Sequence, residues 1–212
     1  DGEKVFDNGT VRTHFEKRNG HWALHETGAN ELWKQQHANG PIDDAFHLPF
    51  VCVRGTGTAW NEVASKSAEA QLQRFEKEWD KWMRGKLPIK TEMEVTKEDL
   101  ASKHIILFGD PGSNSLIAKV LPKLPITWDK QQLMVGGQKY ESAKHLPMMI
   151  YPNPLGPNQS GLTRKYVVLN SGHTFHEADF KGTNALLYPR LGDYAVVRPV
   201  PTDKEPAAFE VM

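Results

Sequence analysis

Five continuous apolar runs recur along the chain, each bounded by Pro, Gly or polar residues. Their apolar side chains follow one another without the alternation that marks a strand exposed on one face. Each run therefore predicts a strand buried on both faces of a sheet. The runs are LPFVCVRG (48–55), HIILFG (104–109), LPMMIYPNP (146–154), KYVVLNSG (165–172) and DYAVVRP (193–199).

A segment with the apolar spacing of a helix lies between the first two runs. Ala68, Leu72, Phe75, Trp79 and Trp82 follow one another at steps of four, three, four and three, with Gln, Arg, Glu and Lys between them. This spacing places the large apolar side chains on one face of a helix. We expect that face to pack against the sheet rather than to hold a cofactor.

Two further helices have start signals of their own. Thr96 is followed three residues later by Asp99, which resembles a capping box and predicts a short helix. Residues 113–122 predict a second main helix, with Ser113 or Asn114 as its N-cap.

The first 37 residues differ in sequence pattern from the rest of the chain. The stretch TVRTHFEKRNGHWALHE contains Asn19-Gly20, a strong signal for a tight β-hairpin turn. This segment is too small to bury a core of its own. We expect it to be the edge of a larger β-rich subdomain that packs on something else.

Strands alternating with helices imply βαβ crossovers. We therefore predict an α/β fold, a three-layer sandwich with a mostly parallel sheet (Rossmann-like or flavodoxin-like), plus an N-terminal β-hairpin segment. The expected division is a β-rich segment at 1–38, an α/β domain at 39–200 and a C-terminal tail at 201–212.

Polar turns follow four of the apolar runs, at 55–58, 109–114, 152–154 and 170–173. If the strands are parallel, all four turns meet at the carboxyl edge of the sheet, where open α/β sheets bind ligands. The opposing interpretation is that these turns do not mark a site, because every βα connection needs turn residues. The ligand-binding candidates at this edge are Gly109, Asp110, Ser113, Asn114, Asn153 and Asn170.

The turn GDPGSN (109–114) matches neither the Walker A pattern nor the dinucleotide fingerprint, and it lacks the Lys that would reach a phosphate. The backbone N–H groups at the start of the following helix could hold an anion. A capped turn without a ligand is the alternative, and we expect no cofactor.

Metal binding receives little support from the spacing of histidines. His21 and His25 lie in a segment that reads as strand and turn, so they need not share a face. His173 and His176 are three residues apart, but they lack an identifiable third ligand. We therefore predict no metal site.

Nucleophilic catalysis lacks its usual signature, since no G-x-S-x-G occurs in the chain. Cys52 lies inside an apolar run and is expected to be a buried, inert thiol. Ser171 with His173, or Ser113, are the weak catalytic candidates. The adjacent acids Asp43 and Asp44 are more typical of a cap or of carboxylates bound to backbone N–H groups.

Composition narrows the partner classes. The 26 basic residues balance 26 acidic ones, which argues against a broad nucleic-acid footprint. No apolar run is long enough for a membrane-spanning helix. The chain begins DGEKVF, without Met or a signal peptide, so we expect a processed chain or a fragment of a longer protein.

Several segments in fixed order carry a family resemblance: GPIDDAF, FVCVRGTGTAWN, the Trp-rich helix, HIILFGDPGSNSLIAKVLPKLPITWD, MMIYPNPL, KYVVLNSGHTF and DYAVV. Over about residues 39–198 the chain resembles the C-terminal region of bacterial prolyl-oligopeptidase-family (α/β-hydrolase) serine peptidases or esterases. In that family the nucleophile lies in a separate hydrolase domain, so the resemblance implies an accessory domain. It also implies export to the periplasm or the outside of the cell. It assigns no functional residue.

Three hypotheses follow. In the first, the chain is an accessory C-terminal α/β domain of an exported serine hydrolase, not catalytic by itself, whose partner is an α/β-hydrolase catalytic domain in the same precursor or on a separate chain. In the second, it is a module that binds a small ligand or anion at the carboxyl-edge loops. In the third, it is an autonomous hydrolase that uses Ser171 and His173.

Overall fold

We analysed a computed structural model of the chain. It describes residues 15–24, 34, 38–157, 164–182 and 188–212. Contacts divide the chain into two compact units, Asp1–Lys34 and Gln35–Met212.

The first unit contains a two-stranded antiparallel hairpin. Strands β1 (Phe15–Arg18) and β2 (His21–Leu24) pair around Asn19-Gly20. Both turn residues have positive φ angles, 51° and 87°, as a type I′ turn requires. The hairpin predicted from the Asn-Gly pair is therefore confirmed.

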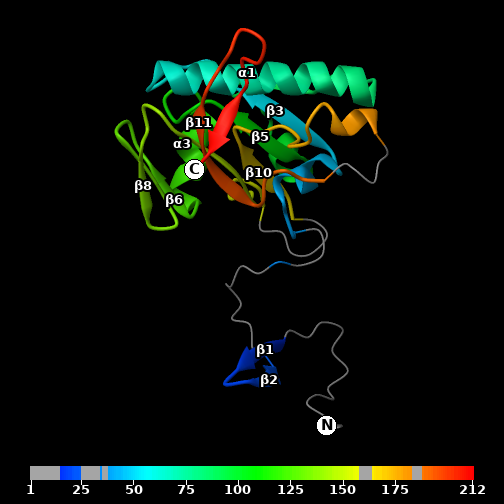
Figure 1. Ribbon diagram of the computed structural model, residues 1–212, viewed down its shortest axis with the longest axis vertical. Helices are drawn as coiled ribbons and strands as arrows, with labels where there is room; N and C mark the ends of the chain where they lie inside the picture. Colours follow the sequence, from blue (N-terminus) through cyan, green and yellow to red (C-terminus); the bar gives the residue numbers. More distant parts are fainter. Residues whose placement is uncertain (1–14, 25–33, 35–37, 158–163, 183–187) are drawn as a thin grey trace. The chain divides into compact units, whose positions relative to one another are not determined.

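The second unit is built on a seven-stranded mixed sheet (Figure 1). The three pairings at one end of the sheet are parallel, and the three at the other end are antiparallel. In spatial order the strands are β12 (Phe209–Val211), β11 (Tyr194–Pro199), β9 (Leu146–Pro152), β10 (Tyr166–Leu169), β5 (His104–Phe108), β3 (Phe50–Arg54) and β4 (Ile89–Thr91).

The predicted three-layer, mostly parallel, Rossmann-like or flavodoxin-like sandwich is wrong. β9 runs antiparallel to both of its neighbours, β10 and β11, and β12 is antiparallel to β11. An apolar run reports that both faces of a strand are buried, but it carries no information on the direction of that strand. Direction depends on the connections, and those around β9 do not reproduce a chain of βαβ units.

One face of the sheet packs against α1 (Glu62–Glu78), which runs above the sheet in Figure 1. Ala68, Leu72 and Phe75 are buried there, as the helical period predicts. The π-helical turn η2 (Trp79–Met83) continues α1, and the 3₁₀ helix η1 (Ile42–Phe46) adds Ile42 and Ala45 to the same core. We call this cluster the α1-side core.

The opposite face packs against α3 (Ser115–Val120), the 3₁₀ turn η3 (Leu121–Lys123) and a small antiparallel sheet. That sheet comprises β6 (Ile126–Trp128), β7 (Gln132–Val135) and β8 (Gln138–Glu141), and β6 and β8 are labelled at the left of Figure 1. A short helix and a β-sheet thus stand where a Rossmann-like fold would have a layer of helices. We call this cluster the α3-side core.

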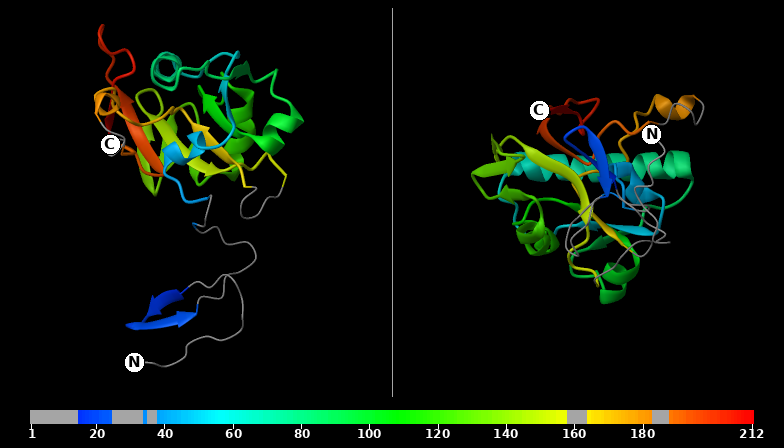
Figure 2. Two further views of the ribbon diagram at one scale, coloured as in Figure 1. Left: turned by 90° about the vertical axis from the view of Figure 1, so that its right-hand side faces the viewer. Right: turned by 90° about the horizontal axis from the view of Figure 1, so that it is seen from below.

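Short elements complete the second unit. α2 (Lys97–Ser102) begins with the predicted capping box, because Thr96 and Asp99 each accept a hydrogen bond from the backbone N–H of the other. The 3₁₀ turn η5 (Asp179–Lys181) follows β10. Residues 201–212, expected to form a tail, include β12 and are joined to α1 by the bond from Gln71 Nε2 to Ala207 O at 2.6 Å. Figure 2 shows the same elements from two further directions.

Among the described residues, no helix combines the length and the apolar character needed to cross a bilayer.

Candidate functional site

The carboxyl edge of the sheet is where β3, β5 and β10 end. These strands are parallel, so the loops 55–58, 109–114 and 170–173 leave the sheet on the same side. The loop 152–154 does not join them, because β9 is antiparallel to β10. The expectation that all four loops meet at one edge is therefore wrong for Asn153, whose Oδ1 accepts the N–H of Leu155 at the opposite edge.

Asp110 is the central charge of the carboxyl edge and is 1% exposed. Its Oδ1 accepts the N–H groups of Gly112 and Ser113 at 3.0 and 2.8 Å. Its Oδ2 accepts those of Trp60 and Asn61 at 2.7 and 3.4 Å. These four backbone donors surround an anion, but the anion is the chain's own carboxylate.

Ser113 and Asn114 also bond inward. Ser113 Oγ accepts the N–H of Asp110 at 2.9 Å. Asn114 Nδ2 donates to Val53 O at 3.2 Å and to Phe108 O at 3.1 Å, which joins the ends of β3 and β5. Its Oδ1 accepts the N–H of Leu116, so Asn114 rather than Ser113 is the N-cap of α3. Both side chains hold the turn together.

The loop after β3 fits closely against this turn because Gly55 has no side chain. A Cβ at Gly55 would lie 2.3 Å from Ser113 O, a distance that real Cβ atoms do not reach. Gly57 N donates to the same carbonyl at 2.8 Å. The glycines of RGTGTAW therefore serve backbone packing in this structure.

Gly109 and Asn170 join the ends of β5 and β10. Gly109 N donates to Asn170 Oδ1 at 2.8 Å, and Asn170 N donates to Leu107 O at 2.8 Å. Both residues have positive φ angles, 121° and 52°. Four of the predicted binding side chains, those of Asp110, Ser113, Asn114 and Asn170, are thus brought together, and each makes hydrogen bonds that hold the fold.

The candidate pair Ser171 and His173 does not form a nucleophile and base. Ser171 Oγ donates to Gly172 O at 2.9 Å and is buried. His173 Nε2 lies 3.0 Å from Glu78 Oε2, a carboxylate on α1. The contacts of these described residues include no hydrogen bond between the serine and the imidazole.

The surroundings of His173 form a cluster that the sequence did not indicate. Its ring packs against those of Phe75, Phe175 and Phe180, with centroid distances of 5.4, 5.8 and 5.2 Å. Arg74 pairs with Glu78 at 3.1 Å and donates to Phe175 O at 2.7 Å.

The only sequence signal for this cluster was the i,i+4 spacing of Arg74 and Glu78 on one helix face. The cluster attaches the segment after β10 to α1.

Asp43 and Asp44 have separate partners. Asp43 Oδ1 accepts the N–H of Thr174 at 2.7 Å, and Asp44 Oδ2 accepts the hydroxyl of Tyr166. The interpretation of these acids as carboxylates bound to backbone N–H groups is therefore confirmed for Asp43, whereas Asp44 accepts a side-chain hydroxyl instead.

Cys52 is fully buried, and burial raises the pKa of its thiol. His25 lies outside the described residues, so the His21 pair cannot be placed. In the part of the chain that is described, no three His, Cys, Asp or Glu side chains are grouped as metal ligands.

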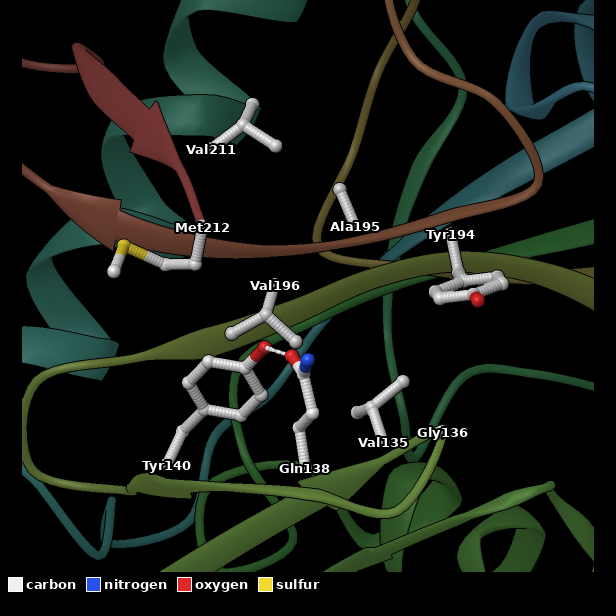
Figure 3. A pocket seen from close by; sticks show the side chains of 9 residues that line it. All are labelled: Val135, Gly136, Gln138, Tyr140, Tyr194, Ala195, Val196, Val211 and Met212. Atoms are coloured by element: carbon white, nitrogen blue, oxygen red, sulfur yellow. Dashed lines mark hydrogen bonds between the residues drawn. The ribbon is translucent and has the colours of Figure 1, made fainter.

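A separate pocket of about 300 Å³ opens between the small sheet and strands β11 and β12 (Figure 3). Three distant segments form it, so no local pattern in the sequence could have indicated it. Its lining residues are Val135, Gly136, Gln138, Tyr140, Tyr194, Ala195, Val196, Val211 and Met212.

Comparison with protein-family models, with curated proteins and with solved structures found no match to this chain. The similarity to prolyl-oligopeptidase-family proteins therefore remains a prediction from the sequence.

Proposed function

We propose that this chain is an accessory, non-catalytic α/β domain that works beside an α/β-hydrolase catalytic domain. In this role the catalytic serine is on the partner domain, where acyl transfer takes place. The resemblance over about residues 39–198 motivates the choice of partner. Export to the periplasm or to the outside of the cell is part of the same proposal.

The inward hydrogen bonding of the carboxyl edge is the observation that carries this proposal. Asp110 accepts four backbone N–H groups, and Asn114 joins the ends of two strands while it caps a helix. A catalytic or ligand-binding loop needs polar side chains that are directed at a substrate. Side chains used in this way favour a rigid supporting domain.

The third hypothesis, an autonomous hydrolase, makes a different demand. It needs Ser171 Oγ near a base, whereas the hydroxyl donates to a neighbouring carbonyl and the imidazole faces Glu78. It would therefore require a rearrangement of the segment after β10.

The first experiment treats the full chain with a fluorophosphonate probe, which labels activated serines. We expect no labelling above that of a Ser171→Ala variant. Labelling that is lost in Ser171→Ala or Ser113→Ala would overturn the non-catalytic role.

The second experiment tests the partner. We expect the coding DNA upstream of the Asp1 codon, or a neighbouring gene, to encode an α/β-hydrolase region with G-x-S-x-G. That region, expressed separately, should co-elute with this chain in size-exclusion chromatography. A hydrolase region that elutes independently, or the lack of any such region, would contradict the proposed partnership.

A further inference from the structure

The pocket between the small sheet and the C-terminal strands is assembled by two hairpins of the second unit. One wall comes from the end of β7, the turn after it and β8, and it includes Val135, Gly136, Gln138 and Tyr140. The other comes from the start of β11 and the end of β12 (Figure 3). β11 runs in the same direction as β3, so its start lies away from the carboxyl edge.

The lining carries no charged side chain among its nine residues. An anionic ligand would lose hydration there without gaining a counter-charge, which is unfavourable. The lining does contain hydrogen-bonding groups, namely the hydroxyls of Tyr140 and Tyr194 and the amide of Gln138. This combination of groups suits a neutral ligand that is polar at its edges.

Tyr194 supplies a large aromatic surface at the rim of the pocket. It is 60% exposed, and its hydroxyl lies 4.0 Å from where a Cβ on Gly136 would be. The ring therefore stands beside the β7–β8 turn with much of its surface open to solvent. Aromatic faces carry partial negative charge and attract the weakly positive C–H groups of a flat ligand.

Tyr140 and Gln138 form the polar part of the pocket. The Tyr140 hydroxyl donates to Gln138 Oε1, which orients the amide (Figure 3). This bond leaves the Gln138 Nε2 group able to donate to a ligand. A polyhydroxylated ligand can bond to such a fixed amide and a phenol while one of its C–H faces lies on Tyr194.

We propose that this pocket binds a pyranose ring of a neutral carbohydrate. The ring stacks on Tyr194, and its hydroxyl groups bond to Gln138 and Tyr140. A cavity of about 300 Å³ is at the small end of ligand sites and accommodates a single sugar ring. This site is independent of the proposed partnership with a hydrolase, so either can fail alone.

The test titrates the full chain with methyl glucopyranoside, methyl galactopyranoside, methyl mannopyranoside and methyl xylopyranoside, with amide chemical shifts as the readout. We expect at least one sugar to bind with a Kd on the order of 1–10 mM, with shift changes confined to residues lining the pocket. No saturable shift up to about 100 mM for any of the four would overturn the proposal.

Two variants distinguish specific binding in the pocket from nonspecific binding to exposed tyrosines. Tyr194→Ala should weaken binding about tenfold or more, whereas Tyr188→Ala, an equally exposed tyrosine outside the pocket, should not change it. Equal loss in both variants would overturn the assignment.

Discussion

Asp110 Oδ2 accepts the backbone N–H of Trp60 at 2.7 Å, and this bond links the loop after β5 to the loop after β3. Asp110 is buried, so its negative charge is balanced by oriented backbone dipoles instead of by water. The same four donors could have held an external anion. The carboxyl edge therefore uses the chemistry of an anion site to stabilise the fold.

Replacing Asp110 should destabilise the protein. In Asp110→Ala the N–H groups of Trp60, Gly112 and Ser113 lose their acceptor inside the fold, so the free energy of unfolding should fall by about 3 kcal/mol. Asp110→Asn keeps one carbonyl oxygen as an acceptor, so its free energy of unfolding should lie between those of the wild type and Asp110→Ala. Urea denaturation measures the change, and the exposed Asp203→Ala is the matched control. Equal stability of both alanine variants would contradict this role.

His104 should make stability depend on pH. Burial, together with the nearby charge of Lys165, lowers the pKa of its imidazole from 6.5 to about 4. Its Nδ1 accepts the N–H of Tyr166 at 2.8 Å, which requires that nitrogen to be unprotonated.

Between pH 6.5 and 4 the unfolded state binds the proton and the folded state does not, so stability falls as the pH falls through this window. The loss should approach about 3 kcal/mol. His104→Asn, which keeps an acceptor near Tyr166 N, should flatten the pH dependence, whereas the exposed His47→Asn should keep the wild-type curve. Parallel curves for all three proteins, measured by urea denaturation at each pH, would exclude His104 as the source.

Asp99 should be the most sensitive acid around α2. Burial alone would raise the pKa of its carboxyl, but hydrogen bonds from Lys103, Lys90 and Thr96 outweigh burial and hold that pKa well below its usual range. A lowered pKa means that the ionised form stabilises the fold above the unfolded pKa of about 3.9, and that this contribution is lost as the pH falls below it.

At neutral pH Asp99→Ala should lower the free energy of unfolding by about 3 kcal/mol, because it leaves two lysines without their buried partner and removes the capping box. Glu98→Ala, on the exposed side of the same first turn, should change it by less than about 0.5 kcal/mol. Thermal melting of the two variants is the comparison, and a larger effect for Glu98 would refute the assignment.

Cys52 should not react in the folded protein. Its thiol is fully buried in the α1-side core, and burial raises its pKa. A thiol reagent such as an aromatic disulfide should therefore modify the chain only as fast as it unfolds, and at once in concentrated urea. Rapid modification of the native chain would show that strand β3 opens locally.

Local patterns in the sequence determined several elements correctly. The stripe Ala68, Leu72 and Phe75 is the buried face of α1, Asn19-Gly20 turns the hairpin, and Thr96 with Asp99 caps α2. Each of these depends on residues within a few positions of one another, so spacing and residue type suffice. The apolar runs likewise mark buried strands, because burial on both faces excludes polar side chains.

Only the tertiary structure decided how those elements combine. The direction of β9 depends on its connections, and it separates Asn153 from the other predicted site residues. The roles of Asp110 and His173 depend on partners far along the chain, Trp60 and Glu78, which no local pattern indicates. The same apolar run or polar turn fits either outcome, since its composition records burial and chain reversal but not which distant atoms it will meet.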